Sequence, residues 1–219
     1  MKKDRIIFLI VFLFLAAFRV ASGYCQKTDV DLIKNLKLIE SKMSNINTLT
    51  TKFVQIKDLS LFKQKLEIKG SLYLKKPSSF AWHIDVPLKQ RIILEKNIVK
   101  QWDEDTNQVQ KINLDKNPSF SIMTDQMKRW VSGSYLSLVD EYEIEIVQSS
   151  PIRLKFTPLE NSMAFKMIKS IVILFQEDET YIESIVISET NGDSTKFQFL
   201  ETSLNVALDP QAWKIKPSD

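Results

Sequence analysis

The spacing of apolar residues changes along the chain from a helical period to a strict alternation. Between Thr28 and about Asn45, apolar side chains recur every three or four residues, and lysine, asparagine and glutamate fill much of the other side. This spacing predicts an amphipathic helix, which Thr28 can cap and Asp31 can stabilise from the first turn. Its apolar positions are Leu32, Ile33, Leu36, Ile39, Met43 and Ile46.

From about residue 51 to residue 112 the period becomes two. The alternation is clearest between Lys65 and Lys75, and it resumes from Phe80 to Asp85 after turn residues around Pro77. This pattern is typical of half-buried antiparallel strands with their apolar side chains on one face. The apolar members are Leu66, Ile68, Leu72, Leu74, Phe80, Trp82 and Ile84.

A second helical pattern starts at Asn117, where Pro118 suits the first helical position, and Gly133 ends it. Its apolar residues fall roughly on one side: Phe120, Met123, Met127, Trp130 and Val131. Five further runs favour strands, over residues 142–148, 152–157, 167–176, 181–188 and 194–204.

The order helix, strands, helix, strands predicts a mainly β fold of the α+β class with about eleven strands. A large antiparallel sheet of this kind curls or partly closes, and we expect the helices to pack against one side of it. No repeat, linker or shift in composition divides residues 24–219, so we expect one domain.

Residues 1–23 have the order of a secretory signal peptide. Basic residues precede a 13-residue apolar run, Ile6–Phe18, and small residues end at Gly23. A membrane-spanning helix needs about 20 apolar residues, so we favour cleavage after Gly23 over an uncleaved anchor. Cys25 follows Tyr24 rather than a small residue, which argues against its lipidation. The mature domain is expected outside the cytoplasm.

Removal of this segment changes the charge of the protein. The whole chain has a formal net charge of +3, but residues 1–23 hold four basic residues and one acidic residue, which leaves 26 of each. A neutral domain lacks the basic surface of nucleic-acid-binding proteins, so we expect no nucleic-acid partner. Cys25 is the single cysteine and can form no internal disulfide, so the fold must rest on its core.

Residues suited to catalysis or metal binding are scarce. His83 is the only histidine, and its position in the alternation places it at the surface, on the face opposite Trp82. One histidine and one cysteine argue against zinc sites and Cys–His dyads. The few glycines form no phosphate-binding loop, and the acidic turn 103–107 lacks the glycine and distal glutamate of a calcium loop. We therefore predict no enzymatic activity, no metal and no cofactor.

Several segments together resemble the signature of the LolA-type periplasmic lipoprotein carriers. They are Phe53-Val54-Gln55, the run from Gly70 to Trp82 with Lys76-Pro77 inside it, Pro87, Trp102-Asp103, Gln108-Val109 and Leu154-Lys155-Phe156-Thr157-Pro158. The resemblance implies an unclosed antiparallel β-barrel with an apolar concave face under a lid of helices. It also implies a monomer in the periplasm that takes acylated lipoproteins from an inner-membrane ABC-type release complex and hands them to an outer-membrane receptor.

On this resemblance we expect two groups of site residues. The lipid-binding cavity would be lined by Leu66, Ile68, Leu72, Leu74, Phe80, Trp82, Ile84 and Trp102. The lid would be formed by Leu36, Ile39, Met43, Met123, Met127 and Trp130. Phe80 would also help to receive cargo.

Two positions depart from the family pattern. Lys76 stands where the family has an arginine that ties the lid to the barrel, and a lysine lacks the planar fork of that side chain. Lys96-Asn97 replaces the usual Asp-Gly turn. The cargo could therefore be an acylated lipoprotein or another lipid-linked molecule, and a non-transporting lipid sensor or scaffold on the same fold remains a third reading.

Overall fold

The computed structural model describes residues 30–60, 65–117, 121, 129–130 and 132–216. In this part of the chain, helix α2 (Val30–Ser44) precedes eleven strands that form one antiparallel sheet. The strands are β1 (Thr48–Asp58), β2 (Leu66–Lys75), β3 (Ser79–Val86), β4 (Gln90–Glu95), β5 (Ile98–Asp103), β6 (Val109–Asn113), β7 (Tyr142–Ser149), β8 (Ile152–Pro158), β9 (Ile168–Phe175), β10 (Ile182–Glu189) and β11 (Ser194–Leu204).

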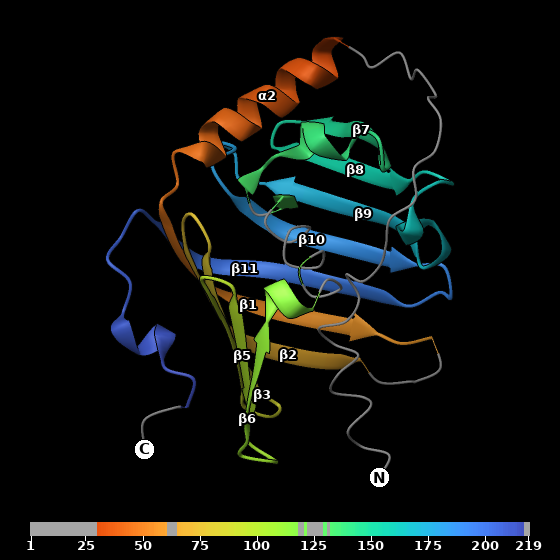
Figure 1. Cartoon of the computed structure of the whole chain (residues 1–219). Coiled ribbons are helices and arrows are strands. Elements are labelled where there is room, and N and C mark those ends of the chain that lie inside the picture. Colours follow the sequence, from red (N-terminus) through yellow and green to blue (C-terminus); the bar gives the residue numbers. More distant parts are fainter. Residues whose placement is uncertain (1–29, 61–64, 118–120, 122–128, 131, 217–219) are drawn as a thin grey trace.

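The sheet is joined at its middle by the first and last strands. β1 pairs with β2 on one side and with β11 on the other, while β6 and β7 form the two edges. In Figure 1 the strands β3–β6 turn sharply away from the direction of β1 and β7–β11, so the sheet curls without closing. The expected mainly β fold, an unclosed antiparallel barrel of about eleven strands, is confirmed.

We call the face of the sheet that carries Leu72, Phe80 and Phe197 the inner face, and the opposite one the outer face.

Gly70, on β2, permits the close approach of β2 and β3 within the curl. A Cβ atom on Gly70 would lie 1.8 Å from the carbonyl oxygen of His83, and the strand register shifts between Lys69 and Gly70. Only a residue without a side chain fits here.

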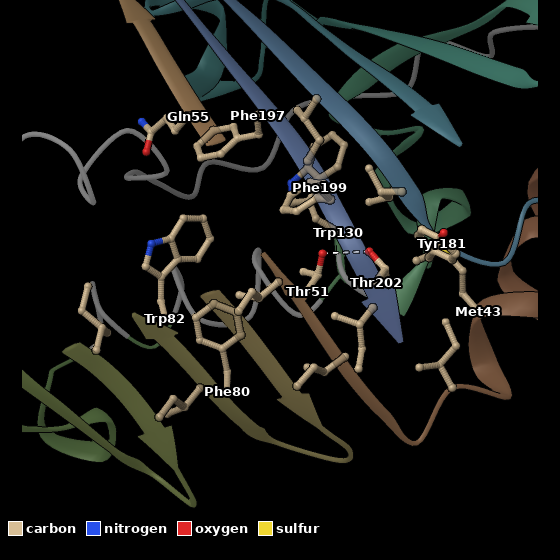
Figure 2. A pocket seen from close by; sticks show the side chains of 18 of the residues that line it. Met43, Thr51, Gln55, Phe80, Trp82, Trp130, Tyr181, Phe197, Phe199 and Thr202 are labelled. Atoms are coloured by element: carbon tan, nitrogen blue, oxygen red, sulfur yellow. Dashed lines mark hydrogen bonds between the residues drawn. The ribbon is translucent and has the colours of Figure 1, made fainter. Parts of the chain in front are cut away.

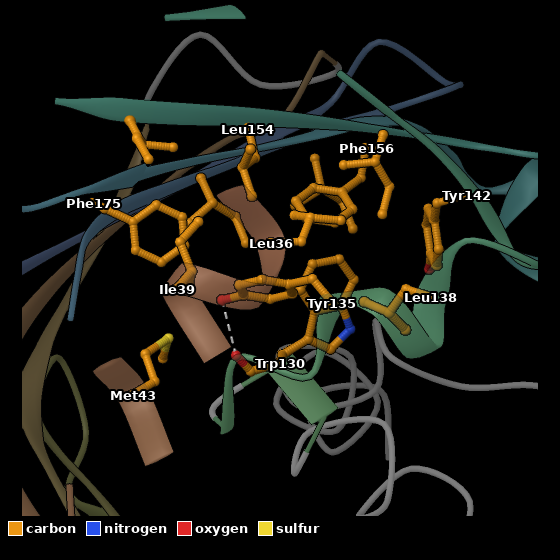
Figure 3. Packing of buried hydrophobic residues seen from close by; sticks show 14 of the residues in the cluster. Leu36, Ile39, Met43, Trp130, Tyr135, Leu138, Tyr142, Leu154, Phe156 and Phe175 are labelled. Carbon is orange, nitrogen blue, oxygen red and sulfur yellow. Dashed lines mark hydrogen bonds between the residues drawn. The ribbon is translucent and has the colours of Figure 1, made fainter. Parts of the chain in front are cut away.

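One half of the inner face is filled by a large core (Figure 3). α2 buries Leu36 and Ile39 completely in this core, as its sequence pattern predicts. The ring centroids of Trp130 and Phe156, on β8, lie 4.9 Å apart. The buried Tyr135 hydroxyl donates a hydrogen bond to the Trp130 carbonyl oxygen over 3.1 Å. The strands that contribute most of this core are β7–β10, so α2 covers that half of the sheet.

The helix expected from residue 28 to about residue 45 is observed as α2, and each later run expected as a strand is observed within two residues of its predicted ends. Of the second helical pattern, residues 121, 129, 130 and 132 are described and helical. Phe120, Met123, Met127, Val131 and the predicted signal peptide lie outside the described residues. No helix in the described ranges has the length and hydropathy to span a membrane.

The surface position expected for His83 is wrong. His83 does lie on the outer face, but it is 8% exposed because the short 3-10 helix η5 (Pro210–Trp213) packs over it. Its Nε2 donates to the carbonyl oxygen of Ala212 over 2.9 Å. Burial, together with the nearby Arg91 guanidinium, lowers the pKa of His83 from 6.5 to about 4.

Candidate functional site

The half of the inner face that α2 leaves open holds an apolar cavity of about 230 Å³ (Figure 2). Strands β1–β5, β10 and β11 form its walls, and the last turn of α2 and Trp130 close one end. Its described lining residues are Met43, Ile46, Leu49, Thr51, Gln55, Leu72, Leu74, Lys76, Phe80, Trp82, Ile84, Ile92, Leu94, Val99, Trp130, Tyr181, Ile182, Ile185, Ile187, Phe197, Phe199 and Thr202.

Five of the eight residues expected to line the cavity do so. Leu72 and Leu74 on β2 alternate onto the inner face, and Phe80, Trp82 and Ile84 do the same on β3. Period-two spacing brings them together because directly paired residues of antiparallel strands share a face: Leu72 pairs with Trp82 and Leu74 with Phe80.

Leu66 and Ile68 lie on the same face but beyond the cavity. Ile68 is 1% exposed and packs with Phe53 and Ile84, and Leu66 contacts this cluster. These two side chains therefore continue the apolar inner face next to the cavity without lining the cavity itself.

The expected placement of Trp102 in the cavity is wrong. Trp102 pairs with Arg91, which in turn pairs with His83, so all three lie on the outer face. The indole Nε1 donates to Asn107 Oδ1 over 3.0 Å, and Lys216 Nζ donates to the same oxygen. Trp102 is thus part of the contact between the sheet and the C-terminal segment.

An aromatic wall spans the cavity, and sequence reasoning identified only part of it. Trp82 packs on Phe53 with ring centroids 4.5 Å apart and meets Phe197 edge-on at 5.9 Å. Phe197 and Phe199 alternate with polar neighbours on β11, and this alternation could have indicated that their side chains share one apolar face. The fact that β11 lies beside β1 could not be read from that alternation, because about 140 residues separate the two strands.

The expected lid residues divide into two groups. Met43 and Trp130 line the cavity, whereas Leu36 and Ile39 lie deeper in the core between α2 and β7–β10. Met123 and Met127 lie outside the described residues. The described lid residues therefore form one apolar layer over the β7–β10 half of the inner face, and Met43 and Trp130 lie at its border with the cavity.

Lys76 fastens the end of α2 to β2. Its ammonium group donates to the carbonyl oxygens of Met43, over 2.7 Å, and Ser44, over 3.1 Å. A cation suits these last carbonyls of a helix because they lack partners within it and carry the negative end of the helix dipole. Partial burial lowers the pKa of Lys76.

A second contact holds the same turn of α2 to the opposite half of the sheet. Lys42 Nζ donates to Glu179 Oε2 over 2.6 Å and to the carbonyl oxygen of Asp178 over 2.8 Å, both in the β9–β10 turn. The closing end of α2 is thus tied to both β2 and the β9–β10 turn.

Polar side chains are few in the described lining. The hydroxyl groups of Thr51 and Thr202 pair with each other over 2.8 Å, and Thr51 also donates to backbone. Gln55 is 3% exposed. Such a site has no nucleophile paired with a base among the described residues; what it offers is shelter for an apolar ligand.

The sequence was compared with known families and proteins. The family described as "Outer membrane lipoprotein carrier protein LolA" matches residues 44–216. The chain belongs to the LolA family. Two relatives named outer-membrane lipoprotein carrier protein, from Hahella chejuensis and Pseudomonas aeruginosa, are 23% and 24% identical to it. These alignments cover 96% and 92% of this chain and 95% and 91% of the relatives.

Among solved structures, the MucA/MucB complex of Pseudomonas aeruginosa matches with a TM-score of 0.55 at 11% identity, over 84% of this chain and 61% of that chain. At this identity the likeness shows a shared fold alone. The LolA-family resemblance expected from the residue motifs is confirmed, and at about 23% identity this chain is a divergent member.

Proposed function

We propose that this protein is a periplasmic carrier that shelters the acyl chains of lipoproteins in the inner-face cavity and shuttles them from the inner to the outer membrane. The apolar cavity under the end of α2 is the observation that carries the proposal. Each buried methylene contributes about 0.8 kcal/mol, so a diacylated protein crosses an aqueous compartment only with such cover. No covalent step is needed, and the protein acts as a binding protein, not an enzyme.

The size of the cavity supports a lid that moves. At about 230 Å³ it is smaller than the roughly 300–1,000 Å³ of pockets that hold drug-sized ligands. Two acyl chains therefore enter only if Met43, Trp130 and the rest of the apolar layer give way. This layer and the cargo compete for the same inner face, which keeps binding reversible.

Lys76 acts as the latch of this lid. Opening at the end of α2 breaks its two hydrogen bonds and the Lys42–Glu179 ion pair. These contacts are polar and few, whereas Leu36 and Ile39 hold the middle of α2 in the core. The end of the helix is thus the part that moves most readily.

The donor and acceptor in this proposal are an inner-membrane ABC-type release complex and an outer-membrane receptor, with the protein passing between them as a monomer. Export with loss of residues 1–23 places it in the periplasm. The alternative cargo is another lipid or lipid-linked envelope intermediate.

Native mass spectrometry of the protein purified from the periplasm without detergent tests the proposal. We expect a one-to-one complex with an acylated lipoprotein. A free lipid bound in its place would favour the alternative cargo. Consistent absence of any apolar ligand would contradict both and favour a non-transporting scaffold.

A further inference from the structure

One end of the cavity is polar, although the rest of its lining is apolar. Gln55 lies on the inner face of β1, lines the cavity and is 3% exposed. Its side chain forms no hydrogen bond with any described residue. Figure 2 shows its amide at the end of the cavity near Trp82 and Phe197, far from Met43.

Other polar side chains lie beyond this end, outside the lining of the cavity. Lys57 follows on the same face of β1 and is 4% exposed, and it pairs across the sheet with Thr195 on β11. Thr195 also pairs with Ile187, which lines the cavity. Among the described residues, the buried Thr195 Oγ1 has no hydrogen-bond partner, and neither has the buried Glu189 Oε1, whose carboxyl group interacts electrostatically with Lys57.

These open groups are costly in the free protein. A hydroxyl buried without a partner, such as that of Thr195, costs about 1–3 kcal/mol. The Gln55 amide instead borders the cavity, where a ligand can reach it. By contrast, Thr51 and Thr202 satisfy each other, and Lys76 is bonded to α2. The unpaired groups therefore gather at one end of the cavity.

Gln55 is the polar side chain of this end that lines the cavity, whereas Lys57 lies outside the lining and interacts electrostatically with the Glu189 carboxyl group. The amide NH2 of Gln55 can donate hydrogen bonds, so a carbonyl oxygen is a matching ligand group. In an acylated cargo the acceptors at the head of the apolar chains are the carbonyl oxygens of the acyl esters and amides. We propose that the Gln55 amide forms a carbonyl-binding subsite that fixes the head of the acyl chains at this end of the cavity. The inference rests on the proposed function and adds to it the orientation of the cargo.

The test compares two synthetic lipopeptides that differ only at the carbonyls: a cysteine peptide carrying a dipalmitoyl glyceryl ester group and its dihexadecyl ether analogue. The wild-type protein is expected to bind the ester about fivefold to tenfold more tightly, the effect of one hydrogen bond. The variant Gln55→Met keeps the shape of the side chain and should bind both peptides with nearly equal affinity.

The matched control is Gln198→Met, on β11 but exposed on the outer face, which should keep the wild-type preference. Gln55→Met should melt close to the wild-type temperature, because it keeps the size of the side chain and breaks no hydrogen bond to a described residue, so a lost preference does not reflect misfolding.

An infrared spectrum of a peptide with isotope-labelled ester carbonyls supplies a direct readout. The carbonyl band should lie at lower frequency in the wild-type complex than in the Gln55→Met complex. Equal affinity of the wild-type protein for ester and ether, or an unchanged preference in Gln55→Met, would overturn the subsite and leave the carrier intact. Failure to bind either peptide would instead overturn the proposed function.

Discussion

At the scale of single residues, Lys76 joins the helix to the sheet. Its ammonium group holds the last carbonyl oxygens of α2 and at the same time borders the cavity. A lysine makes these contacts as a point charge, so it holds the helix end without the fixed planar geometry of an arginine.

Replacement of Lys76 by Met should loosen the end of α2. Loss of the two hydrogen bonds and of the cation at the helix C-terminus should cost about 1–2 kcal/mol of stability. Hydrogen exchange should speed up over the last turns of α2, and Lys76→Arg should restore protection. The control Lys75→Met changes the exposed neighbour and should leave exchange unaltered. Equal exchange in Lys76→Met and wild type would contradict the latch.

Replacement of Gly70 by Ala should be among the most damaging single changes to the sheet. The new Cβ would lie 1.8 Å from the His83 carbonyl oxygen, a backbone atom that cannot turn aside. Overpacking of this severity should cost about 3 kcal/mol or more, measured by urea denaturation. Ser71→Ala, one residue away, should stay within about 0.5 kcal/mol of wild type; a similar small effect for Gly70→Ala would refute the close approach.

His83 should make the stability of the protein depend on pH. Its folded-state pKa of about 4 lies below its ordinary value of 6.5. Between these values the unfolded chain binds a proton that the folded protein does not, so stability is lost as the pH falls from about 6.5 towards about 4. Melting temperatures measured across this range should fall less steeply in His83→Gln than in wild type. Parallel curves would count against a buried neutral imidazole.

Residue by residue, alternation predicted which face of β2 and β3 is apolar, and five cavity residues follow from it. It could not place Trp102, since both faces of β5 are buried and Val99 and Trp102 lie three residues apart on opposite faces. The burial of His83 could not be predicted either. The C-terminal segment folds back over the outer face and contacts His83, and the alternation of β3 contains no information about a contact with residues so far along the chain.

At the scale of elements, α2 has one face in the core and one in solvent. Leu36 is fully buried, whereas Leu38, two residues on, is 43% exposed. The helix is held mainly by this packing, because isolated helices of its length are marginal in water. Its existence and bounds could be predicted from the period alone, but its position over β7–β10 could not.

Leu36→Ala should therefore destabilise the protein by about 2–5 kcal/mol, the usual cost of such a cavity. Leu38→Ala on the same helix is the matched control and should change stability by less than about 0.5 kcal/mol. Chemical denaturation measures both. Equal effects of the two substitutions would show that α2 does not pack as described.

At the scale of the whole molecule, the inner face of one curled sheet is divided between a filled core and a cavity. The strand count could be predicted from the repeated alternation and the curl from the size of the sheet, whereas the unclosed barrel followed from the family resemblance. The meeting of β1 with β11 could not, yet it brings Phe197 and Phe199 opposite Trp82 and completes the cavity. The central claim is that acyl chains of the cargo bind the inner face in place of the apolar lid residues that contact it in the free protein.

Photo-crosslinking in the periplasm tests that claim most directly. A photoreactive amino acid at Ile185, in the cavity, is compared with one at Leu200, exposed on the outer face. The account predicts that Ile185 captures acylated lipoproteins through their acylated N-terminal peptides, identified by mass spectrometry, and that Leu200 does not. Capture at Leu200 alone, or no acylated adduct at Ile185, would contradict it.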